Sequence, residues 1–183
     1  MKLSIGERIT VSKKDKETII KILGKTEGWM NHALLGWLVL WTFTGLYVVY
    51  YVFSGKLTSE QLFFFITYIV FWFYFEIKVL YSWLYKTYGF ELIKITPNEW
   101  YIKKSVFSYG KVQRYTRENI KDVRKVKTDQ KSINAALNKS FWIVGNEQIV
   151  FDYIGKSVGI GVHLNAKDQG ELLMQIRKIM KRK

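Results

Sequence analysis

Two long apolar segments lie in the first half of the chain. Residues 33–53 contain no charge, and as a helix they would be roughly 31 Å long, which is about the thickness of the hydrocarbon core of a bilayer. A second apolar run follows a polar turn in which Thr58 and Gln61 form the pattern of a helix-capping box. The pattern predicts a transmembrane hairpin within residues 29–86, with spans at about 31–53 and 60–82.

Two charged residues interrupt the second run. Glu76 would lie about 21 Å along this helix, so we expect Glu76 and Lys78 near the interface where the helix leaves the membrane and long side chains reach the headgroups. The alternative is that Glu76 binds a proton or an ion inside the membrane. Because Lys78 points to nearly the opposite face, a partner would come from the first helix or another subunit, with Asn31 and His32 as the nearest candidates.

The charges that flank the apolar segments indicate an orientation. The first 28 residues carry seven Lys or Arg, the turn carries only Lys56, and twenty more follow residue 78. Cytoplasmic flanks of transmembrane helices are enriched in Lys and Arg. We therefore expect a multi-pass membrane protein with both termini in the cytoplasm and the turn outside.

The second half of the chain has the period of β-strands. Seven segments are predicted as strands, at 90–95, 99–107, 111–116, 122–127, 141–144, 147–153 and 157–164, and the first two show clear alternation of apolar and polar residues. Residues 128–140 are polar and without strand period, which predicts a loop with one helical turn at 133–138. Asn165 is placed to cap a C-terminal helix with an apolar stripe of Leu172, Leu173, Ile176, Ile179 and Met180.

The same region carries a family resemblance. The segments ITPNEWYIKKSVFSYGKVQRYTRENIKDVR and IVFDYIGKSVGIGVHLNAKDQGELLMQIRK, placed after two spans, resemble membrane-attached bacterial pleckstrin-homology-like proteins. The matching features are Ile120, Val123, Arg124, Gly161, Leu164, Gly170, Leu173 and Ile176. The resemblance covers about residues 30–180 and has no common catalytic residue. It implies an adaptor or scaffold role in a bacterial inner membrane.

Taken together, the hairpin, the strands and the resemblance predict an α+β membrane protein. A two-helix transmembrane hairpin would be followed, at residues 88–183, by a cytoplasmic seven-stranded antiparallel pleckstrin-homology-like barrel with a C-terminal helix.

The basic N-terminal segment, residues 1–28, has two readings. Residues 3–12 could pair as an extra strand, whereas residues 14–26 form a short amphipathic pattern with Ile19, Ile22 and Leu23 on one side. We favour an interfacial helix lying on the cytoplasmic headgroups. The alternative is that this segment packs against the C-terminal domain.

The net charge of +14 points to an anionic partner. Nine cations fall within 25 residues: Lys103, Lys104, Lys111, Arg114, Arg117, Lys121, Arg124, Lys125 and Lys127. They could recognise a specific lipid headgroup, hold the domain against an anionic leaflet, or bind an acidic cytoplasmic protein. Diffuse attraction to the leaflet is favoured because it needs no pocket. Nucleic acid is disfavoured, since the nearby aromatic residues are expected in the core.

The residue inventory disfavours catalysis. The chain has no Cys and two His, so thiol nucleophiles and thiolate metal sites are excluded, and His163 is expected to cap or pack. We find no phosphate-binding glycine loop and no paired-carboxylate motif. We therefore expect neither an enzyme nor a bound cofactor or metal.

The expected function is that of a non-catalytic adaptor or accessory subunit of a membrane protein complex. The apolar segments are rich in Phe, Tyr and Trp, and small residues at Ala33, Gly36, Thr44 and Gly45 would allow close helix contacts. The hairpin would then pack against another membrane protein or against further copies of the chain. The alternatives are an oligomeric channel or transport component that uses Glu76, and a sensor of anionic lipid.

Overall fold

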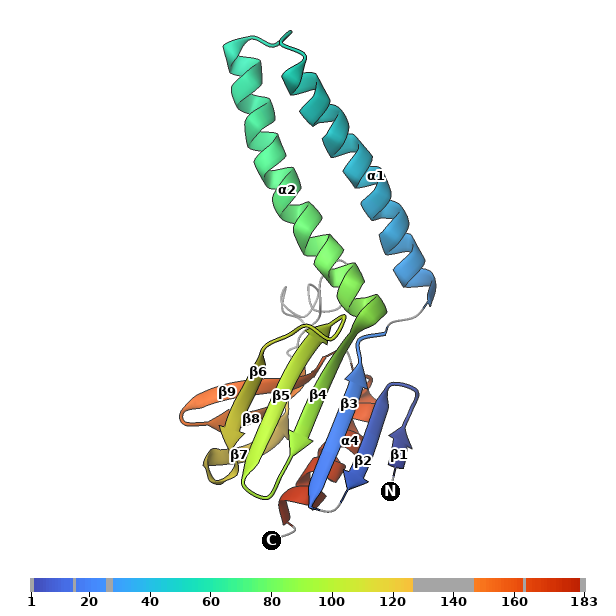
Figure 1. Ribbon diagram of the computed structural model, residues 1–183, viewed down its shortest axis with the longest axis vertical. Coiled ribbons are helices and arrows are strands. Elements are labelled where there is room, and N and C mark those ends of the chain that lie inside the picture. The colour runs from blue at the N-terminus through green and yellow to red at the C-terminus, as the bar shows by residue number, and fades with distance from the viewer. Residues whose placement is uncertain (1, 15, 26–27, 127–146, 163, 182–183) are drawn as a thin grey trace.

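The chain forms a helical hairpin that stands on a domain of two antiparallel sheets and a C-terminal helix (Figure 1). The computed structural model describes residues 2–14, 16–25, 28–126, 147–162 and 164–181. The predicted α+β class is confirmed. The strand predicted at 141–144, the helical turn at 133–138, Lys127 and His163 lie outside the described residues.

The hairpin consists of α1 (Gly28–Phe53) and α2 (Ser59–Tyr88). Both are long and apolar enough to cross a membrane. The predicted capping box is confirmed, since Thr58 accepts from the Gln61 backbone N–H and the Gln61 side chain accepts from that of Thr58. The second helix ends at Tyr88 rather than near residue 82, because no proline or turn sequence stops it, and its 30 residues span about 45 Å.

A six-stranded antiparallel sheet lies below the hairpin, with its strands in chain order. Its strands are β1 (Lys2–Ile5), β2 (Ile9–Lys14), β3 (Glu17–Leu23), β4 (Gly89–Ile95), β5 (Glu99–Val106) and β6 (Val112–Thr116). Half of this sheet therefore comes from the N-terminal segment.

The interfacial helix expected within residues 14–26 is wrong, because this segment contains β3. Ile20 and Ile22 are buried in the core, while Lys21 between them is exposed, which is the two-residue period of a strand. β-branched side chains favour strands, and pairing with β4 along residues 18–23 supplies the backbone hydrogen bonds. The alternative of an extra strand within residues 3–12 agrees with β1 and β2.

The second sheet contains three antiparallel strands, followed by a helix. These elements are β7 (Ile120–Lys125), β8 (Glu147–Tyr153), β9 (Lys156–Val162) and α4 (Ala166–Lys181). A 3₁₀ turn, η1 (Arg117–Asn119), leads from the first sheet into the second. The predicted capping of α4 is confirmed, since Asn165 Oδ1 accepts from the Asp168 backbone N–H at 2.7 Å.

The two sheets do not close into the expected barrel. The outer edge of β4 is occupied by β3 and then by β2 and β1. A barrel formed by the C-terminal strands alone would need β9 to pair with this edge of β4. Because β3 already pairs there, the barrel cannot close in that way. Instead, side chains join the sheets, and the rings of Trp100 and Phe151 meet edge to face at 5.4 Å.

One core joins both sheets to α4. Ile9 and Ile20 from the N-terminal strands, Trp100 from β5 and Phe151 from β8 belong to the same buried cluster. The apolar stripe of α4 covers it, with Leu172, Leu173 and Ile176 buried and Ile179 and Met180 packed at its margin. We call β1–β9 and α4 together the β-domain.

The hairpin is inserted between two neighbouring strands of the β-domain. β3 and β4 are paired, with Leu23 opposite Phe90, and the Gly24 N–H donates to the Gly89 carbonyl at 2.9 Å. A Cβ on Gly24 would lie 2.4 Å from the Tyr85 carbonyl oxygen, so only glycine fits there. The two ends of the hairpin thus leave the sheet side by side.

Candidate functional site: the helical hairpin and its junction with the β-domain

The two helices touch along one narrow stripe. Contact residues recur every three or four positions, as in antiparallel coiled-coil packing. From the β-domain outward, α1 contributes Asn31, Leu34, Leu38, Thr42 and Gly45, and α2 contributes Thr87, Trp83, Val79, Glu76 and Trp72. The stripe combines apolar contacts with three polar ones.

The closest approach is between Gly45 and Trp72. Gly45 is buried, and a Cβ there would lie 1.8 Å from the Trp72 ring. The indole Nε1–H donates to the Trp41 carbonyl at 3.0 Å. Small residues allow this kind of contact between membrane helices, and Gly45 is one of the small residues for which the sequence predicted it.

Glu76 lies inside the hairpin and contacts Thr42. The Thr42 hydroxyl is 2.8 Å from Glu76 Oε1 and 2.8 Å from the Leu38 carbonyl oxygen, either of which can accept its hydrogen. Glu76 Oε2 is buried and has no hydrogen-bond partner among the described residues. Thr42 is one residue from the midpoint of the uncharged run 33–53, so Glu76 lies level with the middle of α1.

The contact of Glu76 comes from the first helix, as one of the two expected sources, but it is Thr42 rather than the candidates Asn31 and His32. Asn31 lies at the base of the hairpin and is hydrogen-bonded to Thr87, at 3.0 Å from its Nδ2 to the Thr87 hydroxyl oxygen. His32 is exposed in the first turn of α1. Helix register decides these contacts, because an antiparallel pair places Glu76 beside Thr42, while residue 31 faces residue 87.

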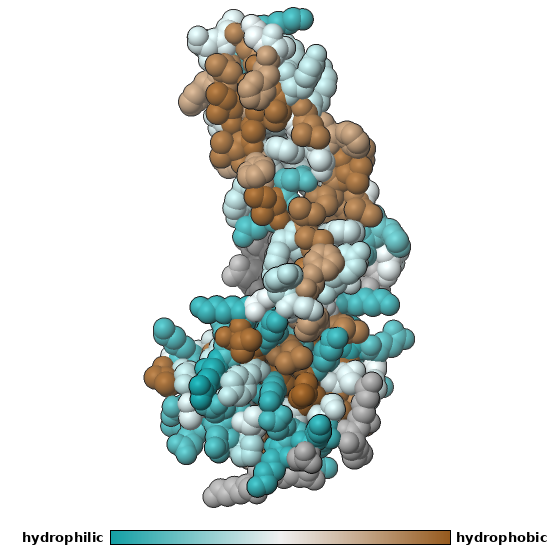
Figure 2. Space-filling model, viewed as in Figure 1, coloured by the Kyte–Doolittle hydropathy of each residue, from teal (hydrophilic) through white to brown (hydrophobic). Residues whose placement is uncertain are grey.

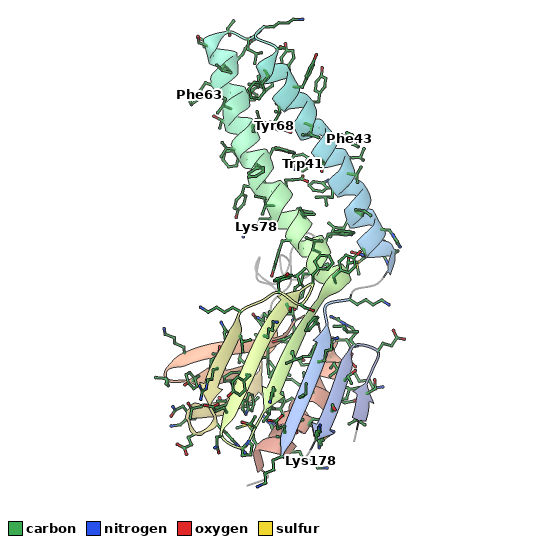
Figure 3. The ribbon with its side chains drawn as sticks, in the orientation of Figure 1. Trp41, Phe43, Phe63, Tyr68, Lys78 and Lys178 are labelled. Atoms are coloured by element: carbon green, nitrogen blue, oxygen red, sulfur yellow. The ribbon has the colours of Figure 1, made fainter. Side chains whose placement is uncertain are left out.

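Lys78 points away from Glu76, as expected from the two-residue spacing. Its Nζ lies 5.5 Å from the centre of the Tyr74 ring, a cation–π distance. In Figure 3, Lys78 projects from the outer side of α2, as Phe63 does, whereas Trp41 lies between the helices. The four polar candidates Asn31, His32, Glu76 and Lys78 do not form one cluster.

The outer surface of the hairpin is apolar and aromatic. Phe63 is 76% exposed, and Phe43, Tyr47 and Phe71 are each more than half exposed. Figure 2 shows apolar surface along the helices and mostly hydrophilic surface over the β-domain. Contiguous exposed apolar surface of this extent marks contact with lipid or with another protein.

A buried carboxyl lies at the junction between the two sheets. Glu91 in β4 is 1% exposed, and its Oε2 accepts from the Gly161 N–H of β9 at 2.8 Å. Burial raises the pKa of Glu91 to about 7, although the positive charge of Lys104 and the Gly161 N–H favour the ionised form. Next to it, Lys104 of β5 pairs with Glu147 of β8 and also connects the two sheets.

Eight of the nine basic residues belong to the described part of the chain, and these eight are spread over both sheets and do not form one patch. Several are held by partners within the β-domain: Lys104 by Glu147, Arg114 by Glu99, and Arg124 by Asp122 and Asp152. Arg117 donates to the Met180 carbonyl at the end of α4 at 2.8 Å. These four side chains have structural contacts.

The remaining four described cations fall into two pairs, one on each sheet. Lys103 and Lys111 lie at the hairpin end of β5 and β6, where Lys103 Nζ donates to the Ser108 carbonyl. Lys121 and Lys125 are exposed on β7, in the other sheet. Among the described residues, no group of three or more His, Cys, Asp or Glu could hold a metal ion.

Two functional candidates, Glu91 and Thr42, were not predicted from the sequence. Glu91 occupies the same strand face as Ile93 and Ile95, so the alternation in FELIKI already contained the signal of a buried carboxyl. Thr42 carried no such signal, because its contact with Glu76 depends on the register of two helices. No protein-family model, no curated protein and no solved structure matches the chain.

Proposed function

We propose that the chain is an integral membrane adaptor or accessory subunit. The hairpin anchors it in the inner membrane and packs against helices of another membrane protein. The β-domain stays on the cytoplasmic side, where it docks a cytoplasmic partner or the leaflet. No catalytic step is assigned to it.

The proposal rests on the exposed aromatic surface of the hairpin. The two helices bury only a narrow stripe of one another, which leaves side chains such as Phe63 and Phe71 without cover from the chain itself. Aromatic side chains are among the residues enriched at the cores of protein interfaces. The number of large exposed rings on this surface therefore favours a protein partner over lipid alone.

The junction between α2 and β4 supports a role in which the hairpin sets the position of the β-domain. α2 ends at Tyr88 and β4 begins at Gly89, with no linker between them. Both ends of the hairpin enter one sheet, so both termini lie on one side of any membrane that the hairpin crosses. The excess of Lys and Arg outside the hairpin supports the cytoplasm as that side, and the pleckstrin-homology-like resemblance is compatible with this arrangement.

The two alternatives have less support. A pathway along Glu76 needs the carboxyl on an outer face, whereas Thr42 holds it between the helices. A sensor of anionic lipid needs free clustered cations, whereas Lys104, Arg114, Arg117 and Arg124 are engaged inside the β-domain.

Site-specific photocrosslinking in membranes tests the proposal. A photoreactive phenylalanine analogue at Phe71, or at Phe43 on the other helix, would face the proposed partner, while the same analogue at the exposed Ile154, in the turn between β8 and β9, serves as a control. We expect the hairpin positions to give a protein adduct of one defined mass that contains a second, different chain. Adducts only between copies of this chain, combined with ion flux in vesicles, would support the channel instead. Adducts only with lipid would contradict a hairpin-bound partner.

A further inference from the structure

A tight turn beside the end of α2 has an unusual sequence for its backbone. Val106 and Tyr109 exchange two backbone hydrogen bonds, of 3.0 and 2.9 Å, so Phe107 and Ser108 are the central residues of the turn. Their φ angles are 49° and 70°. Two positive φ values define a type I′ turn, for which Asn-Gly is the preferred pair. A phenylalanine in this conformation is an outlier.

Burial within the chain does not explain why this turn has aromatic residues. Phe107 is 53% exposed and Tyr109 is 86% exposed. The main contact of Phe107 is a stacked one, with its ring centre 4.5 Å from that of Tyr88, the last residue of α2. A strained backbone that presents exposed rings is an observation from which a binding role can be inferred.

The position of the turn relative to the hairpin identifies what the rings meet. Glu76 is level with the middle of α1, and Tyr88 follows it by twelve residues, which is about 18 Å of helix. Half of the hydrocarbon core is about 15 Å. When the hairpin spans the membrane, the turn therefore lies just outside the hydrocarbon, at the level of the headgroups, where Tyr and Trp side chains concentrate.

Charge beside the turn fits the same environment. Lys103 Nζ donates to the Ser108 carbonyl at 2.6 Å, which holds an ammonium group at the turn. Lys111 follows Tyr109 by two residues and is exposed. Cations at the surface of a cytoplasmic leaflet are attracted to its anionic lipids.

We propose that the turn at residues 106–109 is a second membrane contact, whose Phe107 and Tyr109 rings lie in the headgroup layer of the leaflet that α2 leaves. This proposal rests on the membrane insertion in the proposed function. This contact fixes the orientation of the β-domain relative to the membrane. The turn thus binds lipid rather than a protein.

The absence of cysteine allows single-cysteine probes in the full chain. An environment-sensitive fluorophore is placed at Tyr109→Cys, at Asn98→Cys in the opposite end of the β-domain, and at Val70→Cys within α2. The protein is reconstituted in vesicles of neutral and anionic phospholipid with a nitroxide quencher near the headgroup. We expect the probe at 109 to be quenched several-fold more than that at 98, and the probe at 70 to be quenched by a deeper nitroxide.

The outcomes separate the two proposals. Quenching at 70 with equal, weak quenching at 109 and 98 overturns the membrane contact and leaves the hairpin inserted. Weak quenching at all three positions overturns membrane insertion, and both proposals fail.

A double variant distinguishes a membrane role from a structural one. Phe107→Asn with Ser108→Gly installs the favoured turn sequence and removes the ring. We expect an unchanged or higher melting temperature in detergent, together with weaker quenching of the probe at 109. A lower melting temperature with unchanged quenching would overturn the proposal, because Phe107 would then act in the fold alone.

Discussion

The hairpin and the β-domain handle their apolar residues in opposite ways. In the β-domain, Ile20, Ile93, Phe151 and Ile176 are completely buried in one core. In the hairpin, Leu34, Leu38 and Val79 form a small buried cluster, while most large side chains remain exposed. The described part of the β-domain therefore buries its large apolar side chains in its own core, whereas most of those in the hairpin have no cover from the chain itself.

The two regions also differ in how the chain builds them. The hairpin is one continuous segment, but the β-domain consists of strands from before and after it, joined where β3 pairs with β4. The six-stranded sheet thus depends on residues that are far apart in the sequence. Cutting the chain after the hairpin divides this sheet, whereas cutting out the hairpin alone leaves the sheet whole, so the two deletions should have opposite effects on folding.

The largest effect is expected from truncation. A fragment of residues 89–183 lacks β1–β3 and leaves core residues of β4, such as Ile93, without cover, so we expect it to be unfolded or aggregated. A spliced chain in which residues 25–88 are replaced by Asn-Gly joins Gly24 to Gly89, which are already hydrogen-bonded, through a favoured hairpin turn. We expect this chain to be soluble and folded. Circular dichroism and size-exclusion chromatography compare the two, and a folded fragment with an unfolded splice would contradict the shared sheet.

The second effect is a pH dependence in the β-domain. The pKa of Glu91 is raised to about 7 in the fold from an ordinary value of 4.5. At low pH the carboxyl is neutral in both the folded and the unfolded chain. As the pH rises from about 4.5 to about 7, the carboxyl ionises in the unfolded chain first, so its destabilising effect on the fold grows and then levels off. The shift corresponds to about 3 kcal/mol of unfolding free energy.

Glu91→Gln tests this dependence. The amide oxygen can still accept from Gly161, so we expect a flatter profile of unfolding free energy between pH 5 and pH 8, measured by denaturant unfolding in detergent. Glu118→Gln changes an exposed carboxyl and serves as the control. A wild-type stability that rises over this interval because of Glu91 would show that the residue is ionised in the fold.

A third effect distinguishes the two faces of α1. Gly45→Leu places a side chain against the Trp72 ring, whereas Gly36→Leu meets no atom within 4 Å of its Cβ. Overpacking in a close contact costs about 2 kcal/mol, so we expect Gly45→Leu to lower the melting temperature in detergent and Gly36→Leu to leave it unchanged. Equal effects of the two variants would mean that α1 and α2 do not pack through Gly45.

The smallest effect concerns the polar contact inside the hairpin. Thr42→Val removes the hydroxyl that contacts Glu76, whereas Thr44→Val removes one that donates to the Leu40 carbonyl of its own helix. Hydrogen bonds between membrane helices contribute about 0.6 kcal/mol on average, so the first variant should be slightly less stable. Comparing both variants in a Glu76→Leu background, which has no acceptor, isolates the Thr42–Glu76 interaction, and a zero coupling energy would mean that the two side chains do not interact.

The sequence predicted those elements whose signals are local. The capping box at Thr58, the cap at Asn165 and the alternation in β4, β5 and β8 each lie within a few residues, and each is confirmed. The approximate positions of both long helices follow from uninterrupted apolar composition in the same way.

What the sequence could not predict depends on partners far along the chain. Ile19, Ile22 and Leu23 fit a helical face and a strand equally well, and pairing with β4 decides for the strand. The open arrangement of two sheets follows from the same pairing. Likewise, counting along α2 could not show which residue of α1 lies beside Glu76, because the register of the two helices sets Thr42 there.

Sidedness across the membrane tests the division of the chain most directly. Single cysteines at Lys56, in the turn between the helices, and at Asn98, in the β-domain, are exposed to a membrane-impermeant maleimide on intact cells. We expect labelling at 56 without permeabilisation and at 98 only after it. Labelling of both positions in intact cells, or of 98 alone, would contradict a hairpin that crosses the membrane with the β-domain inside.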